Sequence, residues 1–105
     1  MNIADIVIDS AKNNTIIKTR HYLDQLELRR NDIVPNDDGV HDLLCNRNPV
    51  CISRGRTDDS FKLFYDIDAV YDLMIIISIK SSSPYLISLL AIHKQNAKRR
   101  PKSDE

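Results

Sequence analysis

Apolar residues along the chain follow two different periods, and the change of period divides the sequence into two parts. Over residues 3–11 they recur at steps of three and four, the spacing of one helix face. Asn2 is placed to cap the start of this helix, and Asn13 and Asn14 are placed to end it. From about residue 50 apolar and polar residues alternate instead, which is typical of strands. The pattern therefore predicts helices first and strands afterwards.

The rest of the first part predicts two more helices. A second helical stripe lies within residues 19–30, and the pattern leaves open whether residues 15–19 form a short strand or continue that helix. Proline and aspartates between residues 31 and 39 predict a loop. A short helix is predicted to follow over residues 38–45.

The second part predicts four strands, over residues 50–54, 61–66, 71–80 and 85–94, and the pattern leaves open a short buried helix over residues 86–92 in place of the last strand. The apolar run at residues 74–77 predicts a central strand covered on both faces. Helices followed by closely connected strands predict an α+β fold, with the N-terminal helices packed on one face of an about four-stranded antiparallel sheet. We expect one domain over residues 1–95 and a basic, disordered tail over residues 96–105.

Composition agrees with a single domain and leaves the surface charge open. The chain has 105 residues, 42% of them hydrophobic, and its 15 basic and 15 acidic residues cancel. The cancellation excludes a uniformly basic surface but not a local basic patch. Cys45 and Cys51 are too few for a disulfide scaffold, and no apolar stretch is long enough to span a bilayer. We therefore expect a cytoplasmic protein, not bound to a membrane, with no metal and no cofactor.

The order of elements in the middle of the chain is similar to a known group of proteins. Thr19, Arg20 and His21 open a helix, Arg29 follows, and a short helix precedes an aromatic-rich strand at residues 61–65. This order resembles small toxin ribonucleases of the RelE and BrnT kind and related small families, over about residues 19–80. The resemblance implies RNA as substrate and an antitoxin or host protein as partner. The chain departs from the pattern in a longer loop at residues 31–36 and at position 25, where glutamine replaces a common arginine.

RNA cleavage without a metal requires a base, an acid and cations that stabilise the phosphate charge. His21 and His93 are the candidates for proton transfer because histidine titrates near neutral pH. Arg29 and Arg30 are the candidates for phosphate stabilisation. The alternatives stay open: either histidine can be an ordinary hydrogen-bonded surface residue, and the two arginines can serve only the helix dipole.

Five more residues are candidates for RNA binding, namely Arg54, Arg56, Lys62, Tyr65 and Lys94. The first three flank the hairpin expected at residues 55–60 and would lie on one side of it. Tyr65 would stack on a base, and a packing role in the sheet is its alternative. A solvated hairpin tip is the alternative for the basic residues.

These residues support two hypotheses about function. The first is a metal-independent endoribonuclease of the toxin type. The second is a non-catalytic interaction or regulatory module of phage, plasmid or toxin–antitoxin origin, because residues 71–92 carry enough apolar surface to bind a protein partner or a second copy of the chain.

Overall fold

The computed structural model describes residues 2–29, 34–81 and 85–101. The elements found there are α1 (Ile3–Lys12), β1 (Ile17–Lys18), α2 (Arg20–Leu28), α3 (Asp37–Asn46), β2 (Cys51–Arg54), β3 (Ser60–Asp66), β4 (Tyr71–Lys80), β5 (Leu86–Asn96) and the 3-10 helix η1 (Ala97–Arg99). The predicted α+β class, with its helices ahead of the main strands, is confirmed. The loop predicted between residues 31 and 39 and the connection between the strands predicted at 71–80 and 85–94 lie partly outside the described residues, at 30–33 and 82–84.

The helices start at polar side chains that cap free backbone N–H groups. The side chain of Asn2 accepts a hydrogen bond from the backbone N–H of Asp5, as predicted. Thr19 caps α2 by accepting from Tyr22. After α1 the chain turns at Asn14, whose φ of 56° is in the left-handed region that asparagine tolerates. The predicted end of the first helix is therefore confirmed, and the left-handed backbone conformation of Asn14 explains it.

The sheet is mixed, with strand order β1-β5-β4-β3-β2. Strands β2 to β5 pair antiparallel, in agreement with the predicted meander. The short strand left open at residues 15–19 is present as β1, which pairs parallel to β5 through Ile17 and Ser88, a pairing that the predicted antiparallel sheet did not include. This pairing joins residues some 70 positions apart, so the local pattern could not resolve it.

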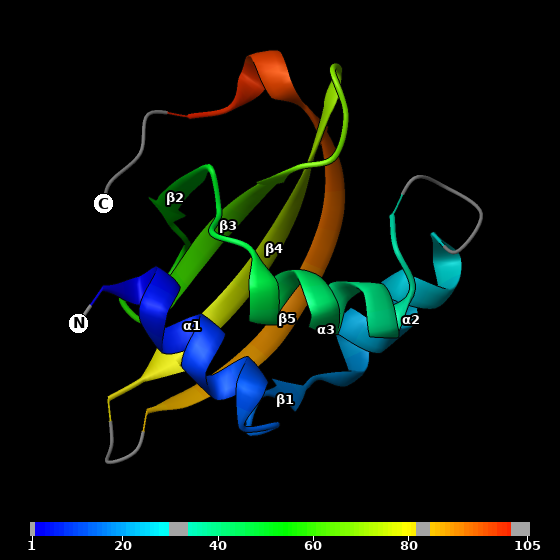
Figure 1. Ribbon diagram of the computed structural model, residues 1–105. Helices are drawn as coiled ribbons and strands as arrows, with labels where there is room; N and C mark the ends of the chain where they lie inside the picture. Colours follow the sequence, from blue (N-terminus) through cyan, green and yellow to red (C-terminus); the bar gives the residue numbers. More distant parts are fainter. Residues whose placement is uncertain (1, 30–33, 82–84, 102–105) are drawn as a thin grey trace.

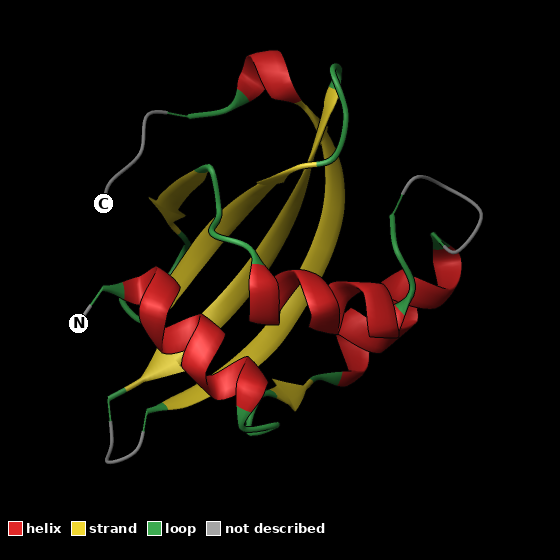
Figure 2. Cartoon of the chain, in the orientation of Figure 1, coloured by secondary structure: helices red, strands yellow, loops and turns green. Residues whose placement is uncertain are grey.

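Helices α1 and α3 lie together over one face of the sheet, and α2 lies at the β5 side (Figures 1 and 2). The core fills the space between these helices and the sheet. Its largest contributions come from inward-facing strand residues, namely Leu63, Tyr65, Leu73, Ile75, Ile77, Ile87, Leu89 and Ile92. We call the opposite side of the sheet the open face.

The C-terminal segment covers one end of the open face. Arg100 forms two hydrogen bonds to Asp72, at 2.7 and 2.5 Å, and this carboxylate is fully buried. The thiol of Cys51 donates to the carbonyl of Pro101 at 3.1 Å. The ordered fold thus extends beyond the predicted boundary at residue 95, because Arg100 neutralises a buried charge. Residues 102–105 of the predicted tail lie outside the described part of the chain.

Candidate functional site

A groove of about 460 Å³ lies on the open face, between α2 and the turn that joins β2 to β3. Four side chains with basic groups line it, namely His21, Arg56, Lys62 and His93. Apolar side chains also line it, namely Met74, Ile76, Leu90 and Ala91. The central strand β4 is therefore only half covered on this side, which corrects the prediction that both of its faces are buried.

Helix α2 contributes His21 to the groove, and two further residues at steps of four lie on the same side of the helix. His21, Gln25 and Arg29 share one side of the helix because this spacing is close to one turn. The buried amide oxygen of Gln25 accepts a hydrogen bond from the backbone N–H of Ile92 in β5, at 2.7 Å. An arginine has no acceptor atom and could not make this bond. Gln25 thus anchors α2 to the sheet between the two basic residues.

An irregularity in β5 brings His93 to the groove. Ile77 pairs with Leu89 and Ile76 with Ala91, so Leu90 is an extra residue in the strand. Strict alternation from Leu89 would direct His93 to the side covered by α1 and α3. The extra residue reverses the alternation and places His93 on the open face, opposite Met74 of β4.

The far wall of the groove depends on a tight hairpin. A Cβ atom at Gly55 would lie 2.2 Å from the hydroxyl of Ser60, so only glycine fits there without a shift. The Gly55 N–H donates to the Ser60 carbonyl, and Ser60 also exchanges hydrogen bonds with Thr57. These contacts fix the turn that carries Arg56 and leads into Lys62.

His93 is in contact with Arg29, at 3.3 Å between the arginine Nη2 and the histidine Nδ1. A guanidinium can only donate, so Nδ1 accepts and the ring proton of a neutral His93 is on Nε2. The pKa of His93 is lowered, mainly by burial and further by the positive charges of Arg29 and His21. Burial and the two basic neighbours therefore favour the neutral form of His93.

The basic side chains at the groove are not paired with acidic residues in the described part of the chain. Within the described part of the chain, no carboxylate forms an ion pair with Arg29, Arg56 or Lys62. The Nε of Arg29 is buried and has no hydrogen-bond partner among these residues. Positive groups gathered without counter-charges favour a bound anion.

Three of the predicted RNA-binding residues do not belong to this groove. Tyr65 is only 1% exposed and faces the core, so it cannot stack on a base, and that prediction is wrong. Burial raises the pKa of its phenol. Arg54 pairs across the hairpin with Phe61, lies 5.5 Å from that ring, and is on the face of α1 and α3. Its predicted common patch with Arg56 and Lys62 is wrong because neighbouring strand residues point to opposite faces.

Lys94 also lies on the far side from the groove. It follows His93 in β5 and pairs with Leu73, a core residue, while its ammonium lies 4.7 Å from the ring of Tyr71. Of the catalytic candidates, His21 and His93 line the groove, Arg29 contacts His93, and Arg30 lies outside the described residues.

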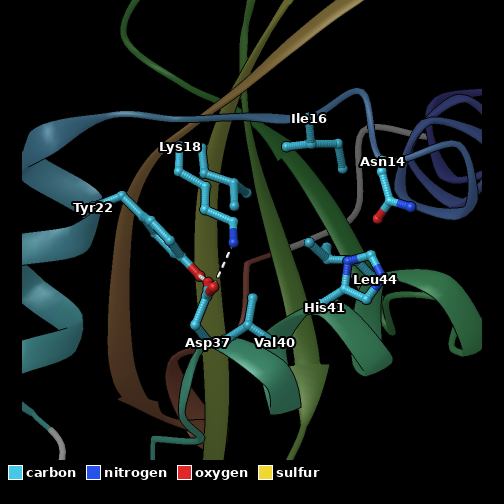
Figure 3. A pocket seen from close by; sticks show the side chains of 9 residues that line it. Asn14, Ile16, Lys18, Tyr22, Asp37, Val40, His41 and Leu44 are labelled. Carbon is cyan, nitrogen blue, oxygen red and sulfur yellow. Dashed lines mark hydrogen bonds and ion pairs between the residues drawn. The ribbon is translucent and has the colours of Figure 1, made fainter.

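A second cavity, of about 280 Å³, lies between β1, α2 and α3. Figure 3 shows the side chains of Lys18 and Tyr22 converging on Asp37. Lys18 forms an ion pair with this carboxylate, and the fully buried Tyr22 donates to it at 3.2 Å. Burial and then the Asp37 charge raise the pKa of Tyr22. The charged groups at this cavity are therefore paired with each other.

Among residues 2–29, 34–81 and 85–101 there is no cluster of three or more histidine, cysteine, aspartate or glutamate side chains that could hold a metal ion. Cys45 and Cys51 are both free thiols. No helix in the described part of the chain is long and apolar enough to cross a membrane.

The fold and groove define a small α+β protein with a basic, half-apolar hollow on its sheet. The chain belongs to the MJ0788 family, whose model matches residues 5–77. The matched region includes α2, β3 and most of β4, and it ends before β5 and His93. No curated protein and no solved structure gives a significant match.

Proposed function

We propose that the groove binds single-stranded RNA and cleaves it without a metal ion. The observation that carries this proposal is the convergence of His21, Lys62 and His93 at one hollow, with Arg29 in contact with His93. Among the described residues, no carboxylate forms an ion pair with Arg29 or Lys62. The resemblance of residues 19–80 to toxin-type ribonucleases adds support.

The groove provides for both parts of a nucleotide. Arg29 and Lys62 offer charged donors to a phosphodiester, and Arg56 extends the basic wall toward the next phosphate. The apolar floor around Met74 and Ile76 accommodates the face of a base or ribose. A single strand fits this arrangement because its bases are free to leave the stack and lie on the protein.

The reaction would be transfer of the phosphate to the neighbouring 2′-hydroxyl. The 2′-oxygen attacks phosphorus, the bond from phosphorus to the 5′-oxygen breaks, and a 2′,3′-cyclic phosphate and a free 5′-hydroxyl result. The 2′-hydroxyl proton passes to one histidine and the other protonates the leaving 5′-oxygen. His21 is exposed on α2 and His93 is half-buried on β5, so a strand lying in the groove would contact both.

The test uses labelled RNA in the presence of EDTA, with identification of both product ends. We expect cleavage by the wild-type chain, a loss of about 100-fold or more in His21→Ala and in His93→Ala, and a normal rate in the matched control His41→Ala. His41 is on α3 at the second cavity, away from the groove. Equal rates in all three variants, or cleavage of an all-DNA strand, would contradict the assignment.

A non-catalytic binding module is the second candidate, and the half-buried apolar floor favours it. Met74, Ile76 and Leu90 give a protein partner or a second copy of the chain an apolar surface within a basic rim. In this case RNA would not be cleaved at all, whichever histidine is present. In both cases we place the protein in the cytoplasm, where free cysteines stay reduced.

A further inference from the structure

The contact between Arg29 and His93 is unusual because it joins a cation to a neutral acceptor. Arg29 donates through Nη2 to the imidazole at 3.3 Å, while its buried Nε has no partner in the described residues. A guanidinium forms stronger hydrogen bonds with an anionic oxygen, and it can bind two such oxygens at once. The observed contact is therefore one that an entering phosphate would replace.

We propose that the phosphate of a bound strand replaces His93 as the hydrogen-bond partner of Arg29. The released Nδ1 of His93 then binds a proton, so that substrate binding converts His93 into the general acid. This inference rests on the proposed function and adds a division of labour between the two histidines. His93 becomes the acid and His21 remains the base.

The proton balance of the step is complete. Before attack, His93 takes one proton from solvent and becomes an imidazolium, while His21 is neutral. As the 2′-oxygen bonds to phosphorus, its proton passes to His21. As the bond to the 5′-oxygen breaks, His93 returns its extra proton to that oxygen. His21 then releases its proton to solvent, and Arg29 can contact Nδ1 again when the product leaves.

The surroundings of His93 favour this change only when an anion is present. Helix α2 presents His21 and Arg29, β3 presents Lys62, and the β2–β3 turn presents Arg56. From β4 the groove receives apolar side chains, and the buried Asp72 of that strand is bound to Arg100. Among the described residues, the titratable or charged groups that line the groove are thus basic and oppose a charge on His93. A phosphate offsets several of them at once.

The experiment follows the two ring nitrogens of His93 by nitrogen-15 NMR, with and without a single-stranded DNA oligonucleotide. This probe has the phosphates of RNA but no 2′-hydroxyl, so it binds without being cut. In the free protein we expect the neutral form, with hydrogen on Nε2, throughout the neutral range. At saturation we expect the titration of His93 to move upward by about one pH unit or more, a roughly tenfold gain in proton affinity.

Variants separate the role of Arg29 from a general effect of charge. Arg29→Gln should raise the titration midpoint of His93 in the free protein and reduce the shift caused by DNA. Arg56→Gln, the matched control, should leave hydrogen on Nε2 in the free protein. Binding of DNA with no change at His93, or hydrogen on Nδ1 in the free wild-type protein, would overturn this inference and leave the proposed function standing. Absence of DNA binding would overturn both.

Discussion

Two cavities of this protein are built from similar residue types and differ in how their charges are paired. At the cavity between α2 and α3, Asp37 receives both Lys18 and the hydroxyl of the buried Tyr22. At the groove on the open face, Arg29 contacts only a neutral imidazole, and Lys62 and Arg56 have no carboxylate partner among the described residues. Paired charges hold elements of the fold together, whereas cations without a carboxylate partner among the described residues, beside an apolar floor, are available to bind an anionic ligand. This difference leads us to place function at the groove.

The largest expected effect tests the groove. Arg29→Gln should slow RNA cleavage by about 100-fold or more, because a donor that stabilises the charged transition state is lost. The free energy of unfolding should change little, since Arg29 has no ion-pair partner to lose among the described residues. Single-turnover cleavage rates and urea unfolding of the same samples check both statements. Normal cleavage in a folded variant would remove Arg29 from the site.

A smaller effect is expected at the cavity between α2 and α3, which we call the paired cavity. It should appear in the free energy of unfolding rather than in activity. Asp37→Asn removes the charge that pairs with Lys18 and weakens the hydrogen bond from Tyr22, so the free energy of unfolding should fall by about 1 kcal/mol. Lys62→Met in the groove should leave it unchanged or raise it, because Lys62 has no ion-pair partner to lose within residues 2–29, 34–81 and 85–101. Urea unfolding curves of the two variants give the comparison. If Lys62→Met were the more destabilising, the two cavities would not differ as described.

Part of this contrast was predictable from the sequence. The helical and alternating patterns predict α1, α2, α3 and the strands of the meander, and residue type together with the resemblance to toxin ribonucleases indicates His21, Arg29 and His93 as candidates. Two features could not be predicted. The extra residue at Leu90 changes which face His93 occupies, and no local pattern marks it. Gln25 departs from the expected arginine because it binds Ile92, a partner 67 residues away.

The errors at Arg54, Tyr65 and Lys94 have one physical cause. The sequence shows that basic and aromatic residues are near each other in the chain. In a strand, however, the side chains of neighbouring residues point to opposite faces of the sheet. Arg54 and Lys94 lie on the face of the helices while Lys62 and His93 lie on the other. Assigning faces requires the pairing register, which depends on contacts between distant strands.

The salt dependence of binding should show a further, more modest difference. Each phosphate neutralised by a cation adds roughly 0.7 to the slope of log affinity against log salt for a single strand. Arg56→Ala should therefore reduce the slope by about that amount, whereas Lys18→Ala at the paired cavity should leave it unchanged. Titrations at several salt concentrations measure the slope. Equal slopes in wild type and Arg56→Ala would exclude Arg56 from phosphate contact.

The smallest expected effect is on stability at mildly acidic pH. The folded state lowers the pKa of His93, so between that value and the unfolded value near 6.5 the unfolded chain binds more protons. The contribution of His93 is fully present above about pH 6.5 and is lost as pH falls through the folded pKa. His93→Gln should flatten this decline when unfolding is compared at pH 7 and pH 5. His41→Gln is the control, and the same flattening there would contradict the assignment.

The most direct test of the central claim compares one lysine from each cavity. Binding of a fluorescent, uncleavable single-stranded DNA is measured for Lys62→Ala in the groove and Lys18→Ala at the paired cavity, with unfolding curves to show that both variants fold. We predict an affinity loss of about tenfold or more for Lys62→Ala, in line with the loss of one charged hydrogen bond, and no loss for Lys18→Ala. The opposite result, or equal affinities, would contradict the placement of the binding site on the open face.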